Sequence, residues 1–343
     1  MRYAEFLPKH GTIGLVAPSF GCNIEPYRTA FLRAQEKWKK MGYELDLGPN
    51  CYEGRGIGIS NTPPECGAEL TRYYMRKEND CLISCGGGEL MCEILDYVDF
   101  DLIRKAPPKW YMGYSDNTNM TFLLATLCDT ASIYGPCAPA FGMEPWHESL
   151  HDAFDILTGK KLCVSGYPLW EKESLKSEEN PTAPYHVTEK RILKVYPEDI
   201  PQVSFEGRLL GGCMDCLVNL LGTKYDRTAE FAEKYKEDGI IWFLESCDLN
   251  VFDIRRAMWQ MEHAGWFEHV KGFLIGRPLC FGQEMMGLNA YQAVLETAAR
   301  KKVPVVMDVD LGHLPPMMPL VVGSMGKVTV EGNEIEIQMR LEV

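Results

Sequence analysis

The stretch Trp110-Tyr111-Met112-Gly113-Tyr114-Ser115-Asp116-Asn117 joins a short apolar run to a helical pattern that continues to Leu127. This order predicts a buried strand, a turn at Ser115 and a helix behind it. A serine on such a turn lies at the carboxyl edge of a parallel sheet. Open α/β sheets bind their ligands at this edge, so the stretch indicates both the fold class and a first candidate site.

The residues that precede this stretch repeat the alternation of strand and helix. The predicted strands are 12–19, 43–47 and 81–84, and the predicted helices are 25–41, 63–76 and 89–98. The pattern favours an α/β fold over residues 1–165, with a mainly parallel, flavodoxin-like sheet covered by helices on both faces.

The chain changes character after residue 165. Residues 166–204 are rich in Glu, Lys, Pro and Ser and show little periodicity, which is typical of a linker or a substrate loop. Strand and helix patterns return at Gly207, and two alternating runs around Glu331-Gly332-Asn333 are typical of a hairpin. We therefore expect a second α/β domain, residues 205–343, with a terminal β-hairpin.

Charge and composition exclude several classes of protein. The 343 residues carry a formal net charge of −13 and form no basic patch, so binding to nucleic acid or to a membrane surface is not expected. No apolar run reaches the roughly 18 residues of a spanning helix, and the N-terminus lacks the apolar stretch of a secretory signal. The sequence predicts a cytoplasmic protein whose 13 cysteines are mostly buried or free thiols.

Ser115 has two possible roles. The N–H groups and dipole of the following helix would stabilise negative charge beside its hydroxyl, as a serine nucleophile requires. Alternatively, the serine only caps the helix, which is a common role for this residue type. Asn117 stands where the G-x-S-x-G elbow has its second glycine, so an ordinary α/β-hydrolase is not indicated.

Gly86-Gly87-Gly88 follows the strand predicted at 81–84. Glycines let backbone amides approach a ligand closely, so an amide here would serve as an oxyanion donor. A tight strand-to-helix turn is the alternative. A phosphate-binding loop is not indicated, because no Gly-Lys-Ser/Thr follows.

Glu245 and His313 each follow a predicted strand in the second half, at 240–244 and 303–309. A histidine at a strand end suits a general base, and a neighbouring carboxylate would hold its tautomer and stabilise the imidazolium. Taken alone, each residue is more simply explained as a loop histidine or a surface glutamate, because most polar residues are exposed. With Ser115, however, they form the set of groups that serine acyl transfer needs.

The order and spacing of these motifs resemble those of the LD-carboxypeptidase family of serine peptidases, family S66, over nearly the whole chain. The matching segments are 13–19, 85–87, 95–97 with Asp99, 113–116, 207–212, 243–245 and 312–313. The resemblance implies an N-terminal domain that carries the nucleophile Ser115. It also implies a C-terminal domain that carries His313 as the base and Glu245 as the residue that orients it.

The same resemblance implies an oxyanion hole and an assembly. The amides of Asp116 and of Gly87 or Gly86 would form the oxyanion hole, and the protein would be a homodimer. No metal ion or other cofactor is predicted.

The long middle segment is more similar to the microcin C immunity branch of this family than to the shorter muropeptide-recycling enzymes. The resemblance implies a small substrate, either a peptidoglycan peptide with a terminal D-amino acid or a peptidyl- or aminoacyl-nucleotide. Cys213 stands where asparagine is expected after the Gly-Gly pair, and Ser246-Cys247 where acidic residues are more usual. These departures bear on substrate preference and not on the three catalytic candidates.

His147-Glu148-Ser149-Leu150-His151 matches the H-E-x-x-H motif and indicates a rival function. On a helix the two histidines would lie one turn apart and bind zinc, with Glu148 as the base of a metallopeptidase. The polar face of an ordinary helix is the simpler interpretation. A third possibility is a non-catalytic binding protein, although the presence of all three catalytic candidates argues against it.

Two further features have open roles. Trp170, in the middle segment, would stack on a substrate ring or anchor the loop to the domain. Cys213 and Cys216 form a lone C-x-x-C. Structural zinc needs four ligands, and no second pair has matching spacing, so a redox pair and buried thiols at a helix start are the two interpretations.

Overall fold

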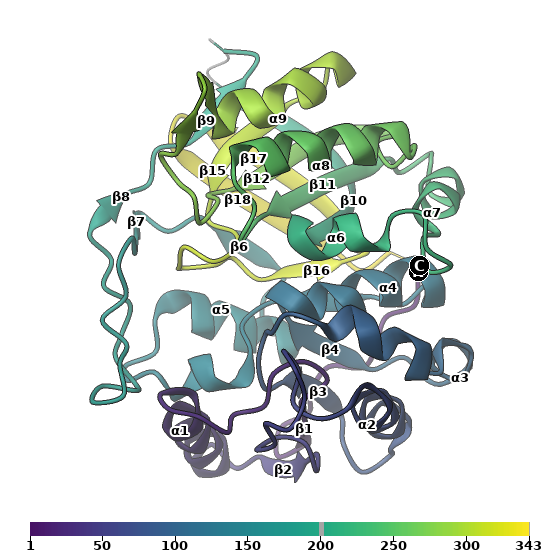
Figure 1. Ribbon diagram of the computed structural model, residues 1–343, viewed down its shortest axis with the longest axis vertical. Coiled ribbons are helices and arrows are strands. Elements are labelled where there is room, and N and C mark those ends of the chain that lie inside the picture. The colour runs from purple at the N-terminus through teal and green to yellow at the C-terminus, as the bar shows by residue number, and fades with distance from the viewer. Residues whose placement is uncertain (199–201, 343) are drawn as a thin grey trace.

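The computed structural model describes residues 1–198 and 202–342, which fold around two β-sheets (Figure 1). The N-terminal half forms the lower part of Figure 1 and the C-terminal half the upper part. Two further pairs of short strands are β7 (Leu169–Trp170) with β8 (Glu189–Lys190) and β13 (Glu284–Met285) with β14 (Leu288–Asn289).

The first sheet has a flavodoxin-like strand order. From edge to edge its strands are β16 (Leu320–Val322), β5 (Ser132–Tyr134), β4 (Trp110–Gly113), β3 (Cys81–Ser84), β1 (Thr12–Val16) and β2 (Glu44–Leu47). The strands from β5 to β2 are parallel, whereas β16 is antiparallel to β5. The order 2-1-3-4-5 of the parallel strands confirms the predicted fold class, and ligands bind at the carboxyl edge of such sheets.

Helices cover both faces of this sheet because alternate strand residues point to opposite sides. In β3, Ile83 packs in one core with Phe31, while Leu82 packs in a second core with Leu70. The helices are α1 (Tyr27–Lys40), α2 (Pro63–Met75), α3 (Phe100–Lys105), α4 (Thr118–Cys128) and α5 (Glu148–Leu157), with 3₁₀ turns at Met91–Tyr97, Ser115–Asn117 and Ala138–Gly142. The helix predicted at 89–98 is thus a 3₁₀ turn, and the buried Asp116 carboxylate accepts its Met91 N–H.

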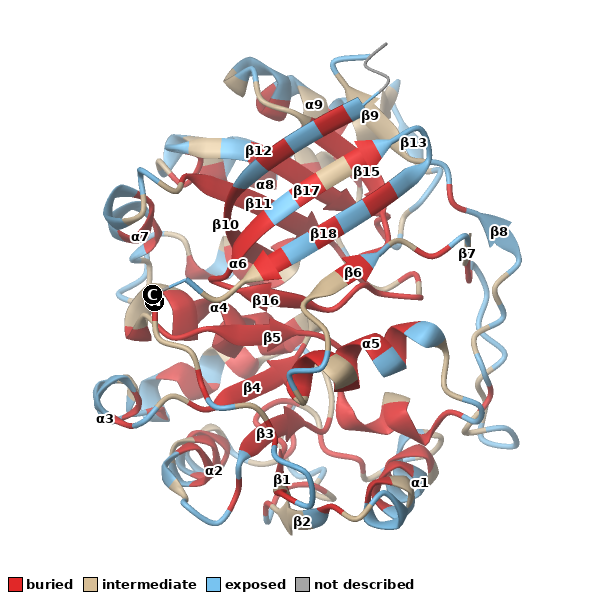
Figure 2. Ribbon diagram, turned by 180° about the vertical axis from the view of Figure 1, so that it is seen from behind, coloured by how far each residue is buried: buried red, intermediate tan, exposed pale blue. Residues whose placement is uncertain are grey.

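The second sheet is mixed. Its strands in order are β6 (Cys163–Ser165), β18 (Glu334–Arg340), β17 (Met325–Glu331), β10 (Gln202–Cys213), β11 (Ile240–Glu245), β12 (Val270–Gly276), β15 (Val305–Val309) and β9 (Lys194–Tyr196). Strands β10, β11, β12 and β15 are parallel. The predicted terminal hairpin is β17 with β18, whose residues alternate between buried and exposed (Figure 2). The helices are α6 (Met214–Leu220), α7 (Thr228–Lys234), α8 (Val251–His263) and α9 (Ala290–Ala298), followed by a 3₁₀ turn at Ala299–Lys301.

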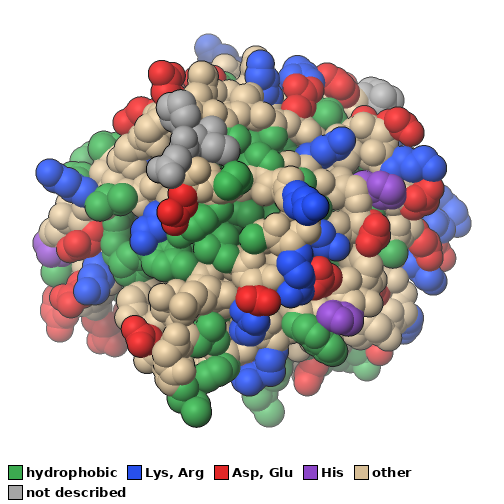
Figure 3. All heavy atoms as spheres, turned by 90° about the horizontal axis from the view of Figure 1, so that it is seen from above, with side chains coloured by type: hydrophobic (Ala, Val, Ile, Leu, Met, Phe, Trp, Pro, Cys, Tyr) green, Lys and Arg blue, Asp and Glu red, His purple; other side chains and the backbone are tan. Residues whose placement is uncertain are grey.

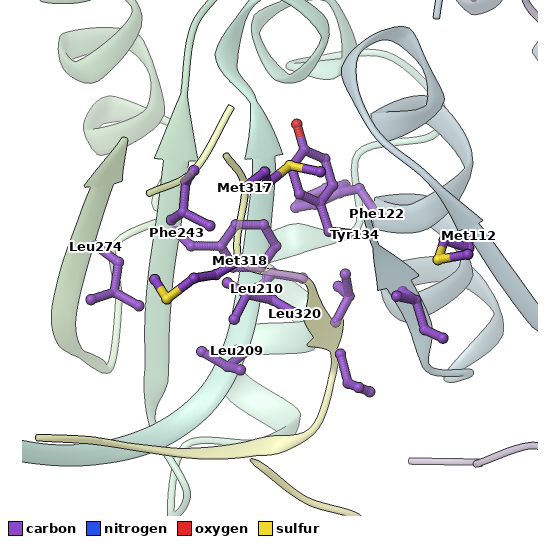
Figure 4. Close-up of a cluster of buried hydrophobic side chains, with 14 of the residues drawn as sticks. Met112, Phe122, Tyr134, Leu209, Leu210, Phe243, Leu274, Met317, Met318 and Leu320 are labelled. Carbon is purple, nitrogen blue, oxygen red and sulfur yellow. The ribbon is translucent and has the colours of Figure 1, made fainter. Parts of the chain in front are cut away.

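The two sheets exchange strands and share a core. Strand β6 pairs with β18 in the second sheet, and β16 pairs with β5 in the first. Buried side chains from both sheets lie together in one cluster (Figure 4), including Phe122, Tyr134, Leu210 and Phe243. Because protein interiors are close-packed, this cluster fixes the two carboxyl edges relative to each other. The division of the chain into domains at residues 165 and 205 stays a prediction.

The segment 166–204, which we expected to lack regular structure, contains short strands. Strands β7 and β8 pair with each other, β9 pairs with β15, and β10 begins at Gln202. Strands of two or three residues are too short to give an alternating pattern, so the sequence does not reveal them. Residues 199–201 of this segment lie outside the described residues.

Over residues 1–198 and 202–342, no helix is long and apolar enough to cross a membrane. On the face shown in Figure 3, acidic and basic side chains are interspersed around a hollow in which hydrophobic side chains gather. This face does not offer the continuous basic surface that a nucleic-acid backbone requires. All 13 cysteines are free thiols, as expected. The cytoplasmic location and the homodimer stay predictions.

Candidate active site

Ser115, His313 and Glu245 meet where the carboxyl edges of the two sheets face each other. Ser115 Oγ lies 2.9 Å from His313 Nε2, and His313 Nδ1 lies 2.8 Å from Glu245 Oε2. The two pairs are 198 and 68 positions apart in the chain, so only the fold brings them together. The arrangement is that of a nucleophile, a base and a carboxylate that orients the base.

Ser115 occupies a strained turn at the end of β4. Its φ of 62° lies in the left-handed region, which residues other than glycine rarely adopt. Such a conformation costs about 1–3 kcal/mol and persists only where the surroundings enforce it. The Ser115 hydroxyl makes no capping hydrogen bond to α4, so the hydroxyl is directed to His313 instead.

Asn117 ties this turn to the glycine loop after β3. Its Nδ2 donates to the carbonyl oxygens of Gly86 (2.7 Å) and Tyr114 (3.1 Å), and its Oδ1 accepts from the Tyr111 hydroxyl at 2.5 Å. The side chain is fully buried. The hydrogen bonds of Asn117 therefore hold the Ser115 turn against the glycine loop. The sequence does not reveal this role, because there Asn117 only marks a departure from the hydrolase elbow.

Gly87 is the glycine that lies against the nucleophile. A Cβ built on Gly87 would lie 3.1 Å from both Cβ and Oγ of Ser115, whereas one built on Gly86 would meet the Phe20 carbonyl oxygen at 3.1 Å. Within the described residues the Gly87 N–H donates to no protein acceptor. Of the two glycines proposed for the oxyanion hole, Gly87 is the better placed.

Asp116, the other predicted oxyanion residue, has a buried carboxylate. It accepts from the Ser19 hydroxyl at 2.5 Å, from the Met91 N–H at 2.9 Å and from Asn119 Nδ2 at 3.1 Å. Burial raises the pKa of Asp116 to about 6, although these hydrogen bonds act in the opposite direction. The carboxylate of Asp116 thus fixes the turn by hydrogen bonds. The backbone N–H of Asp116 is the group that would donate to the oxyanion.

Glu245 ends β11 with a fully buried side chain. Tyr134, at the end of β5, donates its hydroxyl to Glu245 Oε1 at 2.5 Å. Burial raises the pKa of Glu245, but the charge and hydrogen bond of His313, aided by Tyr134, outweigh it and hold the pKa below its ordinary value. Burial and the Glu245 charge raise the pKa of Tyr134 well above its ordinary value, so the phenol stays a donor. Tyr134 was not predicted from the sequence, where its one signal is its position at a strand end.

His313 follows β15 on a turn that requires glycine. Gly312 has a φ of 96°, and a Cβ on it would lie 2.4 Å from Glu245 Oε2. The turn is anchored by the buried Asp310, which accepts from Arg277 Nη2 at 2.6 Å and from the Tyr167 N–H at 2.8 Å. Burial lowers the pKa of His313, but the Glu245 carboxylate outweighs it and raises this pKa well above 6.5.

A cavity of about 540 Å³ opens in front of Ser115 and His313. A volume of this size suits a small ligand. The loop after β1 lines one side of it with Phe20 and Ile24, and Tyr27 lines it from the start of α1. The start of α6 and the loop after β11 line another, with Asp215 and Asp248. The triad can therefore act on a small molecule held between these two walls.

The H-E-x-x-H motif lies outside this arrangement. His147 precedes α5 and accepts the Ser149 N–H at 3.1 Å through Nδ1, while Glu148 and His151 are exposed. Among the described residues, potential metal ligands converge in one group, Cys213, Glu245 and His313, with atoms within 4.8 Å of one another. In this group Glu245 and His313 already bind each other, so the group forms part of the triad's surroundings.

Trp170 does not line the cavity. Its ring packs against Phe281 at 5.1 Å, lies under the Arg277 guanidinium at 4.9 Å, and its Nε1 donates to the Lys190 carbonyl oxygen at 3.2 Å. The residue is buried, so it anchors the middle segment instead of stacking on a ligand in the cavity.

Cys213 and Cys216 do line the cavity. Cys213 Sγ donates to Asp215 Oδ2 at 3.3 Å, and Cys216 Sγ donates to the Ser115 carbonyl oxygen at 3.5 Å. The pKa of the Cys213 thiol is raised well above its ordinary value, first by its hydrogen bond with Cys216 and then by burial. The hydrogen bond with Cys213 lowers the pKa of the Cys216 thiol, but burial outweighs it and the pKa is raised. Cys216 therefore contacts the Ser115 turn as a thiol, whereas Cys213 contacts Asp215.

Two family models match the chain, the LD-carboxypeptidase N-terminal domain over residues 13–135 and the C-terminal domain over 206–328. The microcin C7 self-immunity protein MccF of Escherichia coli is 25% identical over 333 residues, which cover 95% of this chain and 92% of that protein. The probable murein peptide carboxypeptidase of Bacillus subtilis is 24% identical and covers 93% and 88%.

Solved structures of related proteins have the same fold. Wild-type MccF without ligand matches with a TM-score of 0.80, at 23% identity and 98% coverage of both chains. The muramoyltetrapeptide carboxypeptidase from Oxalobacter formigenes matches with a TM-score of 0.71, at 20% identity, over 96% of this chain and 98% of that one. The family models include the Ser115 turn, Glu245 and His313, and together they match most of the sequence. The chain therefore belongs to the LD-carboxypeptidase family of peptidases, as its motifs predicted.

Proposed function

We propose that the protein hydrolyses an amide bond in a small substrate through an acyl-enzyme on Ser115. The observation that carries this proposal is the continuous chain of hydrogen bonds from Ser115 through His313 to Glu245. A weak nucleophile such as a serine hydroxyl needs an adjacent base, and the base needs a third group to orient it. The 2.9 Å and 2.8 Å contacts lie within the range for both functions.

In the first half-reaction, His313 Nε2 takes the Ser115 proton while Oγ attacks the scissile carbonyl carbon. The imidazolium that forms is stabilised by the Glu245 carboxylate, which also accepts a hydrogen bond from the Tyr134 hydroxyl. His313 then gives the proton to the leaving amine nitrogen, and the C–N bond breaks. In the second half-reaction, water attacks the acyl carbonyl carbon and passes a proton to His313. The bond between Ser115 Oγ and the acyl carbon then breaks, His313 returns the proton to Oγ, and the acyl group leaves as a carboxylic acid.

The tetrahedral oxyanion would be bound by the N–H groups of Asp116 and Gly87. The turn that carries Asp116 is fixed by buried hydrogen bonds, and Gly87 lies so close to Ser115 that a Cβ on it would be 3.1 Å from Oγ. Donors that are fixed in advance stabilise developing charge without reorganisation, and losing one typically costs about 10²–10³-fold in rate.

The substrate we propose is a peptidoglycan peptide that ends in a D-amino acid or a peptidyl- or aminoacyl-nucleotide. Structures of the related MccF are described as complexes with aspartyl sulfamoyl adenosine and glutamyl sulfamoyl guanosine, and other relatives are named as murein peptide carboxypeptidases. The cavity of about 540 Å³ is large enough for part of either molecule.

The test is mass spectrometry of two digests by the purified protein, one of a muropeptide that ends in D-alanine and one of an aminoacyl-sulfamoyl adenosine. We expect cleavage at the amide bond of at least one of them, no cleavage by Ser115→Ala, and a serine-directed phosphonate adduct on Ser115. Absence of cleavage of both substrates, or equal cleavage by Ser115→Ala, would overturn the proposal. An intact protein without any phosphonate adduct would favour a non-catalytic binding protein.

A further inference from the structure

The cavity in front of Ser115 has an acidic wall and an apolar wall. Glu89, Asp215 and Asp248 line it from the glycine loop, from α6 and from the loop after β11, and both Glu89 and Asp248 are exposed at its surface. The apolar wall is formed by Phe20 and Ile24 of the loop after β1 and by Tyr27, the first residue of α1. The scissile bond, held at Ser115, would lie between them.

Within the part of the chain that the structure describes, the residues that line this cavity include no lysine or arginine. One cation, Lys176 of the middle segment, lies 5.1 Å from the centre of the Tyr27 ring, on the apolar wall, but does not line the cavity. Among the described lining residues, the side chain that can carry a positive charge is therefore His313, and Glu245 already pairs with it. Such a wall repels carboxylates and phosphates and attracts cations.

Asp215 is rigidly held in this wall. Its Oδ1 accepts the Asp248 N–H at 2.8 Å, and its Oδ2 accepts the Cys247 N–H at 3.0 Å and the Cys213 thiol at 3.3 Å. These bonds fix a negative charge beside the triad. Asp116 also lines the cavity, and although burial is the main cause that raises its pKa, the charge of Glu89 adds to the rise. The charge of Glu89 therefore acts on the carboxylate beside Ser115.

A second observation points to a hydrogen-bond donor on the ligand. Asn119, in the first turn of α4, lines the cavity and is 1% exposed. Its Nδ2 donates to the carbonyl oxygen and the carboxylate of Asp116, but its Oδ1 has no partner among the described residues. A buried acceptor without a partner costs about 1–3 kcal/mol, so a ligand that donates here would relieve that cost.

We propose that the acidic wall selects substrates that carry a protonated amine close to the scissile amide bond, and this inference rests on the proposed function. The ammonium group would interact with Asp248, Glu89 and Asp215, and an N–H of the substrate would reach Asn119. A substrate whose only charge near the bond is a carboxylate would be disfavoured. Partly exposed pairs contribute little each, so the combined preference should be on the order of tenfold.

The experiment compares three forms of whichever substrate the protein cleaves, with its amine free, dimethylated or acetylated. Dimethylation keeps the charge and adds bulk, whereas acetylation adds similar bulk and removes the charge. We expect kcat/KM to fall on the order of tenfold on acetylation and much less on dimethylation, and the ratio to shrink at high salt. Equal rates for the dimethylated and acetylated forms would overturn the inference and leave the proposed function intact.

Variants locate the effect. Asp248→Asn and Glu89→Gln should each reduce the ratio between dimethylated and acetylated substrate, and Asp248→Lys should reverse it. Glu331→Gln is the matched control, because Glu331 is exposed at the end of β17 and does not line the cavity. A ratio that Asp248→Lys leaves unchanged would overturn the inference.

A binding measurement makes the test independent of turnover. Calorimetry on Ser115→Ala with the dimethylated and acetylated forms of both candidate substrates should show tighter binding of the charged form. If the wild-type protein cleaved neither candidate substrate while Ser115→Ala kept this binding preference, the result would count against the proposed function alone. Equal or undetectable binding of both forms would overturn the inference.

Discussion

The two halves of the triad are held in place by different means. On the first sheet, Ser115 is positioned by its own main chain, with φ of 62° enforced by the buried hydrogen bonds of Asn117 and Asp116. On the second sheet, His313 is positioned by a side-chain pair with Glu245. A nucleophile must be placed accurately but stay neutral, whereas a base must be both placed and tuned in pKa. Variants on the two sides should therefore differ in their pH dependence.

The largest effect expected is that of Ser115→Ala. Removal of the nucleophile should lower kcat by about 10⁴–10⁶-fold, because the acyl-enzyme can no longer form. The melting temperature should change by only a few degrees, since the strained backbone stays and one partly exposed hydrogen bond is lost. Rates from a stopped assay and a thermal melt check both. A rate within tenfold of wild type would remove Ser115 from the mechanism.

Glu245→Gln should have the next largest effect, and it should change the pH profile. In the wild type, Glu245 raises the pKa of His313 above 6.5. The neutral imidazole is the active base, so kcat/KM should rise with pH along a limb above 6.5. Loss of the carboxylate should lower kcat by about 10²–10⁴-fold, because the tautomer is no longer fixed, and should move the limb to lower pH.

The measurement is kcat/KM between pH 5 and 9, with the exposed Glu331→Gln as the control that should leave the limb in place. A limb that stays at the same pH in Glu245→Gln would mean that another group titrates there. Asp116, whose burial raises its pKa to about 6, would then be the first to substitute.

The same contrast explains what the sequence could predict. Ser115, Glu245 and His313 lie at or shortly after the carboxyl end of a buried strand, and the carboxyl ends of parallel strands share an edge, so period and residue type suffice to select them. The mainly parallel sheet with helices on both faces was also predicted from the alternation of strands and helices. These features depend on local patterns.

The features that escaped prediction depend on contacts between distant segments. Strand β16 has three residues and joins the first sheet from near the end of the chain, so neither its length nor its neighbours indicate its partner. Tyr134 acts only because β5 ends opposite β11, and Asn117 only because the glycine loop lies beside it. The sequence therefore shows that a polar residue lies at a strand end, but which group it bonds to is decided by the tertiary fold.

Tyr134→Phe tests the contact that joins the two halves. The phenol donates to Glu245 Oε1 at 2.5 Å and also accepts the Ser115 N–H at 3.4 Å. Loss of a hydrogen bond to a charged group should lower kcat/KM by about tenfold. The Glu245 charge would then be less neutralised, so the pKa of His313 should rise and the limb should move to higher pH, opposite to Glu245→Gln. A shift in the same direction as Glu245→Gln would contradict this role.

The smallest expected effect is that of His151→Ala, which separates the triad from the zinc motif. His151 is exposed and packs against Trp146. His147 lies before α5, and its Nδ1 accepts a hydrogen bond from the Ser149 N–H. The variant should retain kcat/KM within about twofold, since surface changes alter stability by only about 0.5 kcal/mol. A chelator should likewise leave the rate unchanged. A loss of activity in both experiments, together with stoichiometric zinc in the purified protein, would show that the catalytic site is the zinc motif at α5 and not Ser115 at the junction of the two sheets. If only the His151→Ala rate fell while chelator had no effect, the helix would be shown to support the fold near the cavity without binding a metal ion.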